Sequence, residues 1–140
     1  MAFLDGLEFL NDLLDAVGAE ADVDAAFLLS ASISADYPLD AALRMARRGI
    51  VNTYNPGDHL LKEGTGALGN VDGRHGDSAG RTGFRRSYQK LYQREITNER
   101  VAREFGSAGA AHFAVTKADL IKKYAPAWLL SKTWPPPGRE

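Results

Sequence analysis

Hydrophobic side chains recur every three or four residues along much of the chain, a spacing typical of helices that pack on a core. Over residues 2–17 the apolar positions fall on one side of such a helix and acidic positions on the other. Residues 24–35 are apolar on nearly all sides, which predicts a buried helix. Pro38 is well placed to begin a third helix, over residues 38–48.

The second half of the chain predicts two further helices and one short strand. Residues 50–54 are typical of a strand, and residues 84–105 return to helical spacing with a break near Thr97. A variant of the capping box at residues 116–119 predicts the start of a helix over residues 117–124. The pattern as a whole predicts a mainly α fold, a small domain of about five helices.

A long glycine-rich loop separates the predicted helices. Eight of the chain's 14 glycines lie between residues 57 and 83, and apolar residues are scarce over 64–83. Irregular loops of this length are usually functional or disordered, so we expect this one to become ordered against a partner. We therefore expect one helical domain over residues 1–131, including loop 64–83, and an extended proline-rich C-terminal tail over residues 132–140.

Composition narrows the class of protein. The 140 residues are 44% hydrophobic and 25% charged, close to globular averages. The absence of cysteine excludes disulfides, thiolate metal sites and cysteine nucleophiles. The first basic residue is Arg44, so a secretory signal is not expected, and no apolar run is long enough for a membrane span. We expect a non-secreted protein, in a cytoplasm or a virion.

The charges are segregated along the chain. Residues 1–43 contain nine acidic residues and no Lys or Arg, whereas residues 44–140 contain all 17 Lys and Arg with the other nine acids. Such asymmetry can steer a partner or hold subunits together. Equally, the two halves can neutralise each other within one fold.

Three short motifs suggest chemistry but lack its context. Gly76-Asp77-Ser78-Ala79-Gly80 resembles the nucleophile elbow of serine hydrolases and the segment around the active serine of trypsin-like proteases, yet no strand pattern precedes it. Gly64, Gly66 and Gly69 match the dinucleotide fingerprint as a string, without the strand and helix that it requires. A metal set is conceivable, but its spacing fits no known pattern; it comprises Asp58, His59, Asp72, His75 and Asp77.

A basic segment over residues 81–103 is the strongest candidate for binding. If it were helical, several of its cations would share a face beside tyrosines and suit phosphate contacts and base stacking. The same cations could instead face an acidic protein surface or the chain's own acids, or be solvated. The candidate residues for a nucleic acid or an acidic partner are Arg81, Arg85, Arg86, Lys90 and Arg94.

The C-terminal tail offers a second binding candidate. Trp134 followed by Pro135, Pro136 and Pro137 is a tryptophan on a stiff arm, which suits a pocket on a neighbouring protein. The alternative is a tail folded back over its own domain.

These features favour a non-enzymatic structural or assembly subunit, for example a virion component. It would act through protein contacts of loop 64–83 and the C-terminal arm, with itself or other subunits as partners and with no cofactor and no metal. The alternative is a nucleic-acid-binding module that uses the basic segment 81–103. A third hypothesis is an enzyme that uses Ser78 or the loop histidines.

Overall fold

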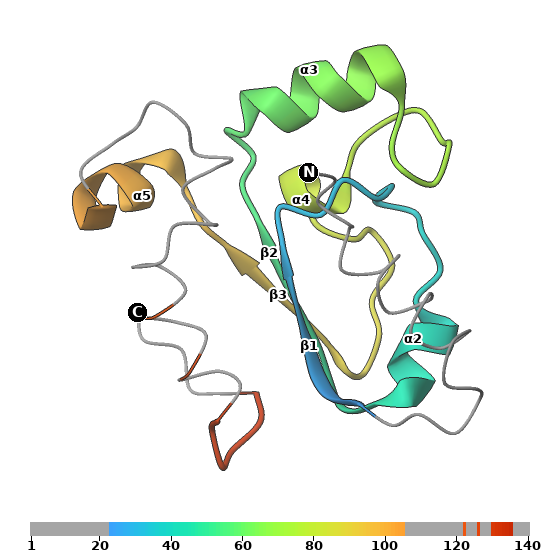
Figure 1. Ribbon diagram of the computed structural model, residues 1–140, viewed down its shortest axis with the longest axis vertical. Helices are drawn as coiled ribbons and strands as arrows, with labels where there is room; N and C mark the ends of the chain where they lie inside the picture. Colours follow the sequence, from blue (N-terminus) through green and yellow to red (C-terminus); the bar gives the residue numbers. More distant parts are fainter. Residues whose placement is uncertain (1–22, 106–121, 123–125, 127–129, 136–140) are drawn as a thin grey trace.

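The computed structural model describes residues 23–105, 122, 126 and 130–135 (Figure 1). The helix predicted over residues 2–17, and all but one residue of that predicted over 117–124, lie outside this part of the chain. Pro136 and Pro137 of the tail also lie outside it.

The described part of the chain is mixed α/β, and the predicted mainly α fold is wrong. Its centre is a three-stranded sheet in the order β1-β2-β3, in which both neighbouring pairs are parallel (Figure 1). The strands are β1 (Val23–Leu29), β2 (Ala46–Tyr54) and β3 (Leu91–Glu95). The helices lie in and after the connections: α2 (Asp40–Met45), α3 (His59–Leu68), α4 (Ala79–Thr82) and α5 (Asn98–Phe105).

The buried helix predicted over residues 24–35 is strand β1 for the first half of its length. Ala26 pairs with Ile50 of β2, and Leu28 pairs with Asn52. A strand in a parallel sheet is covered on both faces, so its apolar residues do not alternate with polar ones. A short continuous apolar run of this kind cannot be distinguished from a buried helix by its spacing.

The helix predicted over residues 38–48 is shorter in the structure. It is α2, which ends at Met45, and β2 begins at the next residue. The strand predicted over residues 50–54 is confirmed as the C-terminal part of β2. Gly49 has a φ of 123°, and a Cβ there would collide with the carbonyl of Lys90, so only glycine fits this close approach of two strands.

The single helix predicted over residues 84–105 is also wrong. This segment contains an irregular stretch, strand β3 and helix α5, and the predicted break near Thr97 coincides with the boundary between β3 and α5. Phe84, Tyr88 and Leu91 suggested one helix because they contact one hydrophobic cluster. These residues share the hydrophobic cluster because the irregular stretch before β3 runs along it, and their spacing resembles that of a helix.

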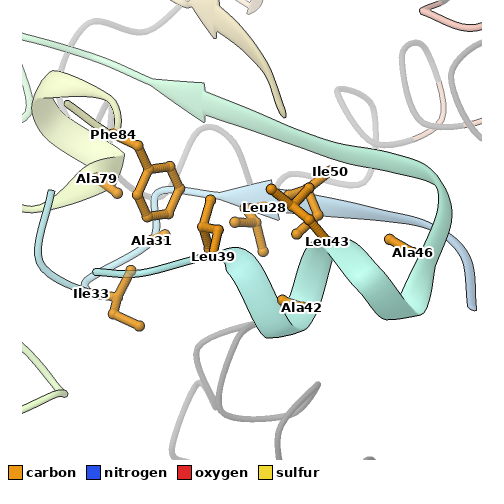
Figure 2. Close-up of a cluster of buried hydrophobic side chains, with 10 residues drawn as sticks. All are labelled: Leu28, Ala31, Ile33, Leu39, Ala42, Leu43, Ala46, Ile50, Ala79 and Phe84. Atoms are coloured by element: carbon orange, nitrogen blue, oxygen red, sulfur yellow. The ribbon is translucent and has the colours of Figure 1, made fainter. Parts of the chain in front are cut away.

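The hydrophobic core lies between the sheet and α2 (Figure 2). Leu28 and Ile50 point from neighbouring strands towards Leu39 and Leu43, and Phe84 closes the far end. Leu39 and Ile50 have no exposed surface. Burying a side chain of this size contributes roughly 1.5–3 kcal/mol, so the cluster holds β1, α2 and β2 as one unit.

The glycine-rich segment 64–83 is not an irregular loop that waits for a partner. It contains the second half of α3 and all of α4. Its backbone is bonded to the segment that follows β1: the amides of Val71, Ala79 and Gly80 donate to the carbonyls of residues 32, 33 and 31 at 3.2, 2.8 and 2.7 Å. The chain's own residues therefore order this segment.

None of the helices in the described ranges has the length and apolar character needed to cross a bilayer.

Candidate functional site

The loops after the parallel strands gather at one edge of the sheet. Segments 30–39 and 55–58 follow β1 and β2, and segment 69–78 joins them between α3 and α4 (Figure 1). In open parallel sheets, ligands bind in the crevice outside the carboxyl ends of the strands. The carboxyl edge of this sheet is therefore a candidate for a site.

Asp58 is a buried acid directly beyond the central strand. Only 1% of it is exposed, and it precedes the first residue of α3. Its carboxylate accepts a hydrogen bond from the Leu61 amide at 3.0 Å, and its own amide donates to the Asn55 carbonyl at 3.0 Å. Asp58 thus caps α3 from within a tight turn.

Two asparagines hold the turn that carries Asp58. The Gly57 amide donates to Asn55 Oδ1 at 2.9 Å, and Asn55 Nδ2 donates to Asn98 Oδ1 at 2.7 Å. Asn98 Nδ2 in turn donates to the Gly57 carbonyl at 3.1 Å. Because these bonds join the turn to α5, the position of Asp58 is fixed by tertiary contacts as well as by its own helix.

A second carboxylate at this edge, that of Asp72, binds the segment after β1. Ser34 Oγ donates to Asp72 at 2.6 Å, and Arg74 Nε lies 3.9 Å from the carboxylate. The Asp72 side chain is 9% exposed. Its role is to hold the 70–76 turn against Ser34.

Asp77 accepts hydrogen bonds from two arginines. Arg81 lies at 2.7 Å and Arg85 at 2.9 Å, and Arg85 also binds Asp36. The conceivable metal set therefore does not converge, since Asp58, Asp72 and Asp77 each bind a different partner. Across residues 23–105 and the short C-terminal ranges, no group of three or more His, Cys, Asp or Glu could hold a metal ion.

Ser78 lies at the start of α4 and has no exposed surface. Its Oγ has no hydrogen-bond partner, and its backbone forms an isolated bridge with Ser34. A nucleophile elbow presents its hydroxyl to substrate at a strand-to-helix turn. A fully buried hydroxyl cannot attack a substrate in this conformation.

The basic residues singled out in the sequence do not form a row on one helix, because the helix does not exist. Arg81 lies in α4, and Arg85 and Arg86 lie in the irregular stretch. Lys90 immediately precedes β3, and Arg94 lies within it. Arg86 pairs with Asp40 at 3.3 Å and lies over the Tyr88 ring. Arg81 pairs with Asp77, and Arg85 pairs with Asp36 and Asp77. Three of the five candidate cations therefore form ion pairs with acids of the same chain.

Trp134 packs on its own domain. Its ring meets Tyr92 of β3 edge-on, with 5.9 Å between ring centroids, and the Arg48 guanidinium lies 4.8 Å from the Trp134 ring centroid. Arg48 also donates to the Ser131 carbonyl. At Trp134 the tail therefore folds back over its own domain, which is the alternative to binding a neighbouring protein. Pro135 is exposed.

Sequence reasoning missed Asn55 and Asn98, and it considered Asp58 only as a metal ligand. A usable signal was present, because the turn at residues 55–58 directly follows the strand predicted over 50–54. This turn indicates a candidate site only when the strands are known to be parallel. In a parallel sheet, the turns that follow the strands lie at the carboxyl edge, where ligands of such sheets bind.

Tyr54 lies at the carboxyl end of β2 and has a pKa above its ordinary value. Partial burial is the main cause, and the negative charge of Glu95, whose carboxylate is 3.3 Å from the hydroxyl, adds to it. The pKa of exposed Glu99 is lowered, first by its own backbone amide and then by the Thr97 hydroxyl.

Comparison with protein-family models, with curated proteins and with solved structures found no match to this chain.

Proposed function

We propose that this chain belongs to an enzyme of α/β type and that Asp58 orients a catalytic histidine at the carboxyl edge of the sheet. The observation that carries the proposal is the burial of Asp58 directly after the central strand. A buried carboxylate fixes the tautomer of an imidazole and stabilises its protonated form. The reaction class that this arrangement supports is general-base catalysis, as in hydrolysis or acyl transfer.

The charge of Asp58 supports a role beyond capping. Asn and Ser cap a helix about as well as Asp does. Removing a carboxylate from water costs several kcal/mol unless other groups compensate it. A neutral residue can also cap α3, so capping alone does not require the charge of the buried aspartate at this position.

The chain contains three histidines that could partner Asp58: His59, His75 and His112. Helix α3 has ten residues, which corresponds to about 15 Å of length. Asp58 lies before its first residue, whereas the His75 ring packs beside Gly69, beyond its last. His75 is therefore remote. His59 is next to Asp58 in the sequence, but it is exposed whereas Asp58 is buried, and His112 lies outside the described residues.

The decisive variant is Asp58→Asn, which keeps the cap acceptor and removes the charge. We expect hydrolysis of a panel of p-nitrophenyl esters to fall by about 10⁴ in kcat, as when the acid of an acid–histidine pair is neutralised, with Tm unchanged. Asp58→Ala is the structural control: it loses the cap as well and should be less stable by about 1 kcal/mol.

The histidines extend the test. Either His59→Gln or His112→Gln should reproduce the loss of activity, and His75→Gln should not. Full activity in Asp58→Asn would show that the carboxylate serves only as a cap. No turnover by the wild-type chain would support the sequence prediction of a non-enzymatic protein, which otherwise stays a prediction.

The other functions predicted from the sequence differ in how they stand. Neither the fold nor the comparisons support a structural or virion role, and the helical description on which it rested is wrong. Protein contacts through segment 64–83 stay a prediction, favoured by the exposure of Leu68 and Val71, 88% and 43%. Nucleic-acid binding by residues 81–103 also stays a prediction, without the helix that was to carry it.

A further inference from the structure

The turn over residues 70–76 points two backbone amides away from its own core. Asn70 donates hydrogen bonds to two carbonyl oxygens of the turn. Its Nδ2 donates to the Arg74 carbonyl at 3.1 Å and to the Gly76 carbonyl at 3.2 Å, and its backbone amide donates to the Arg74 carbonyl at 2.8 Å. In a trans peptide, the carbonyl of one residue and the amide of the next point in opposite directions. The amides of His75 and Asp77 therefore face away from Asn70.

These amides donate to no acceptor among the described residues. Within residues 23–105, no hydrogen bond is donated by the amides of residues 74–77. Gly73 and Gly76 have φ values of 72° and 123°, which bend the backbone at both ends of the Arg74-His75 pair. Backbone amides that point the same way from a turn can together bind an anion, as successive amides do in the concavities known to bind anions.

Two exposed polar side chains, Arg74 and His75, lie between the two glycines. Arg74 is 58% exposed, and its contact with Asp72 is a long one of 3.9 Å. His75 is exposed, and its ring lies beside Gly69, where a Cβ would be 3.5 Å from Cε1. Guanidinium groups bind phosphate oxygens with two parallel hydrogen bonds.

The neighbouring carboxylates are already compensated. Asp72 accepts hydrogen bonds from the Ser34 hydroxyl and amide, at 2.6 and 3.4 Å, and Asp77 accepts from Arg81 and Arg85. These bonds also anchor the turn on both sides, so binding would require little ordering of the backbone.

We infer that the turn at residues 73–77 is an anion-binding site that takes a phosphate group, through the amides of His75 and Asp77 with the side chains of Arg74 and His75. The site goes beyond the proposed function. It lies at the C-terminal end of α3, about 15 Å from Asp58 by the length of the helix. Loss of either site leaves the other intact.

The test is a titration of the ¹⁵N-labelled chain with inorganic phosphate, followed by NMR at constant ionic strength. We expect saturable shifts in the amide resonances of His75 and Asp77. The double variant Arg74→Gln, His75→Gln should weaken binding by tenfold or more. Arg103→Gln, which removes an exposed cation on α5, is the matched control and should bind as the wild type does.

Equal shifts with chloride, or unchanged phosphate affinity in the double variant, would overturn the inference. A parallel titration with glycerol phosphate distinguishes the sources of the group. Tighter binding of the ester than of inorganic phosphate would assign the site to a phosphomonoester, and equal binding would assign it to free phosphate; both support the site.

Discussion

At the scale of single residues, the side chains that define the edge of the sheet are polar and buried. Asn55, Asp58 and Asn70 are each exposed by 4% or less, and hydrogen bonds join them to turns and helix ends. Buried polar groups are costly unless they are bonded, so each one restricts the backbone around it. These bonds hold the loops at the carboxyl edge in place.

Tyr54 supplies a pH prediction at this scale. Its pKa is raised in the folded chain, chiefly by burial and then by Glu95, so the folded state resists loss of the phenolic proton. The stability that this contributes is complete below the ordinary pKa of tyrosine, about 10, and is lost as pH rises towards the folded value. Tyr54→Phe should therefore lose less stability than the wild type between about pH 9 and 11.

Urea denaturation at several pH values measures the effect. Glu95→Gln should reduce it without abolishing it, because burial is the larger cause of the raised pKa. Identical pH profiles for wild type and Tyr54→Phe would contradict the assignment.

At the scale of elements, two helical glycines differ sharply in their surroundings. A Cβ on Gly64, inside α3, would meet nothing within 4 Å. A Cβ on Gly80, inside α4, would lie 2.7 Å from the Ala31 carbonyl oxygen, which belongs to the backbone and cannot move cheaply. The second glycine therefore permits α4 to pack against the segment after β1, and the first has no such role.

We expect opposite signs from the same substitution. Gly64→Ala should stabilise the chain by roughly 0.5–1 kcal/mol, because alanine loses less backbone entropy in a helix. Gly80→Ala should destabilise it by about 1–3 kcal/mol, as overpacked sites generally do. Free energies from urea denaturation test the pair, and a Gly80→Ala variant as stable as the wild type would contradict the packing of α4.

At the scale of the whole molecule, the segregated charges meet within one fold. Acids of the first 43 residues pair with later arginines: Asp24 with Arg47 at 2.9 Å, and Asp36 and Asp40 with Arg85 and Arg86. Exposed pairs like these contribute about 0.2–1 kcal/mol each, so they bias the arrangement modestly. These pairs support the interpretation in which the acidic and basic halves of the chain neutralise each other within one fold.

Association between chains is testable at this scale too. If segment 64–83 makes protein contacts, light scattering after size exclusion should detect an oligomer, and Leu68→Glu should dissociate it. Leu130→Glu is the matched control, because Leu130 is also exposed, at 79%, and lies elsewhere in the sequence. A monomeric wild type at high protein concentration would remove this prediction.

The sequence by itself determined where the chain changes direction. The strand at 50–54, the turn at 55–58 and the break near Thr97 were all predictable from local sequence. Proline fixes its own φ angle, and glycine and asparagine readily adopt the conformations that turns require. The tail packing of Trp134 was one of two predicted alternatives.

Only the tertiary structure decided that residues 23–29 form a strand and that the three strands are parallel. An apolar run such as Ala25–Leu29 suits a buried helix and a buried strand equally, and the pairing of Ala26 with Ile50 selects the strand. The candidate site follows from that choice. Asp58 lies at the carboxyl edge of the sheet only because β1, β2 and β3 run in the same direction, a relation between segments that no local pattern specifies.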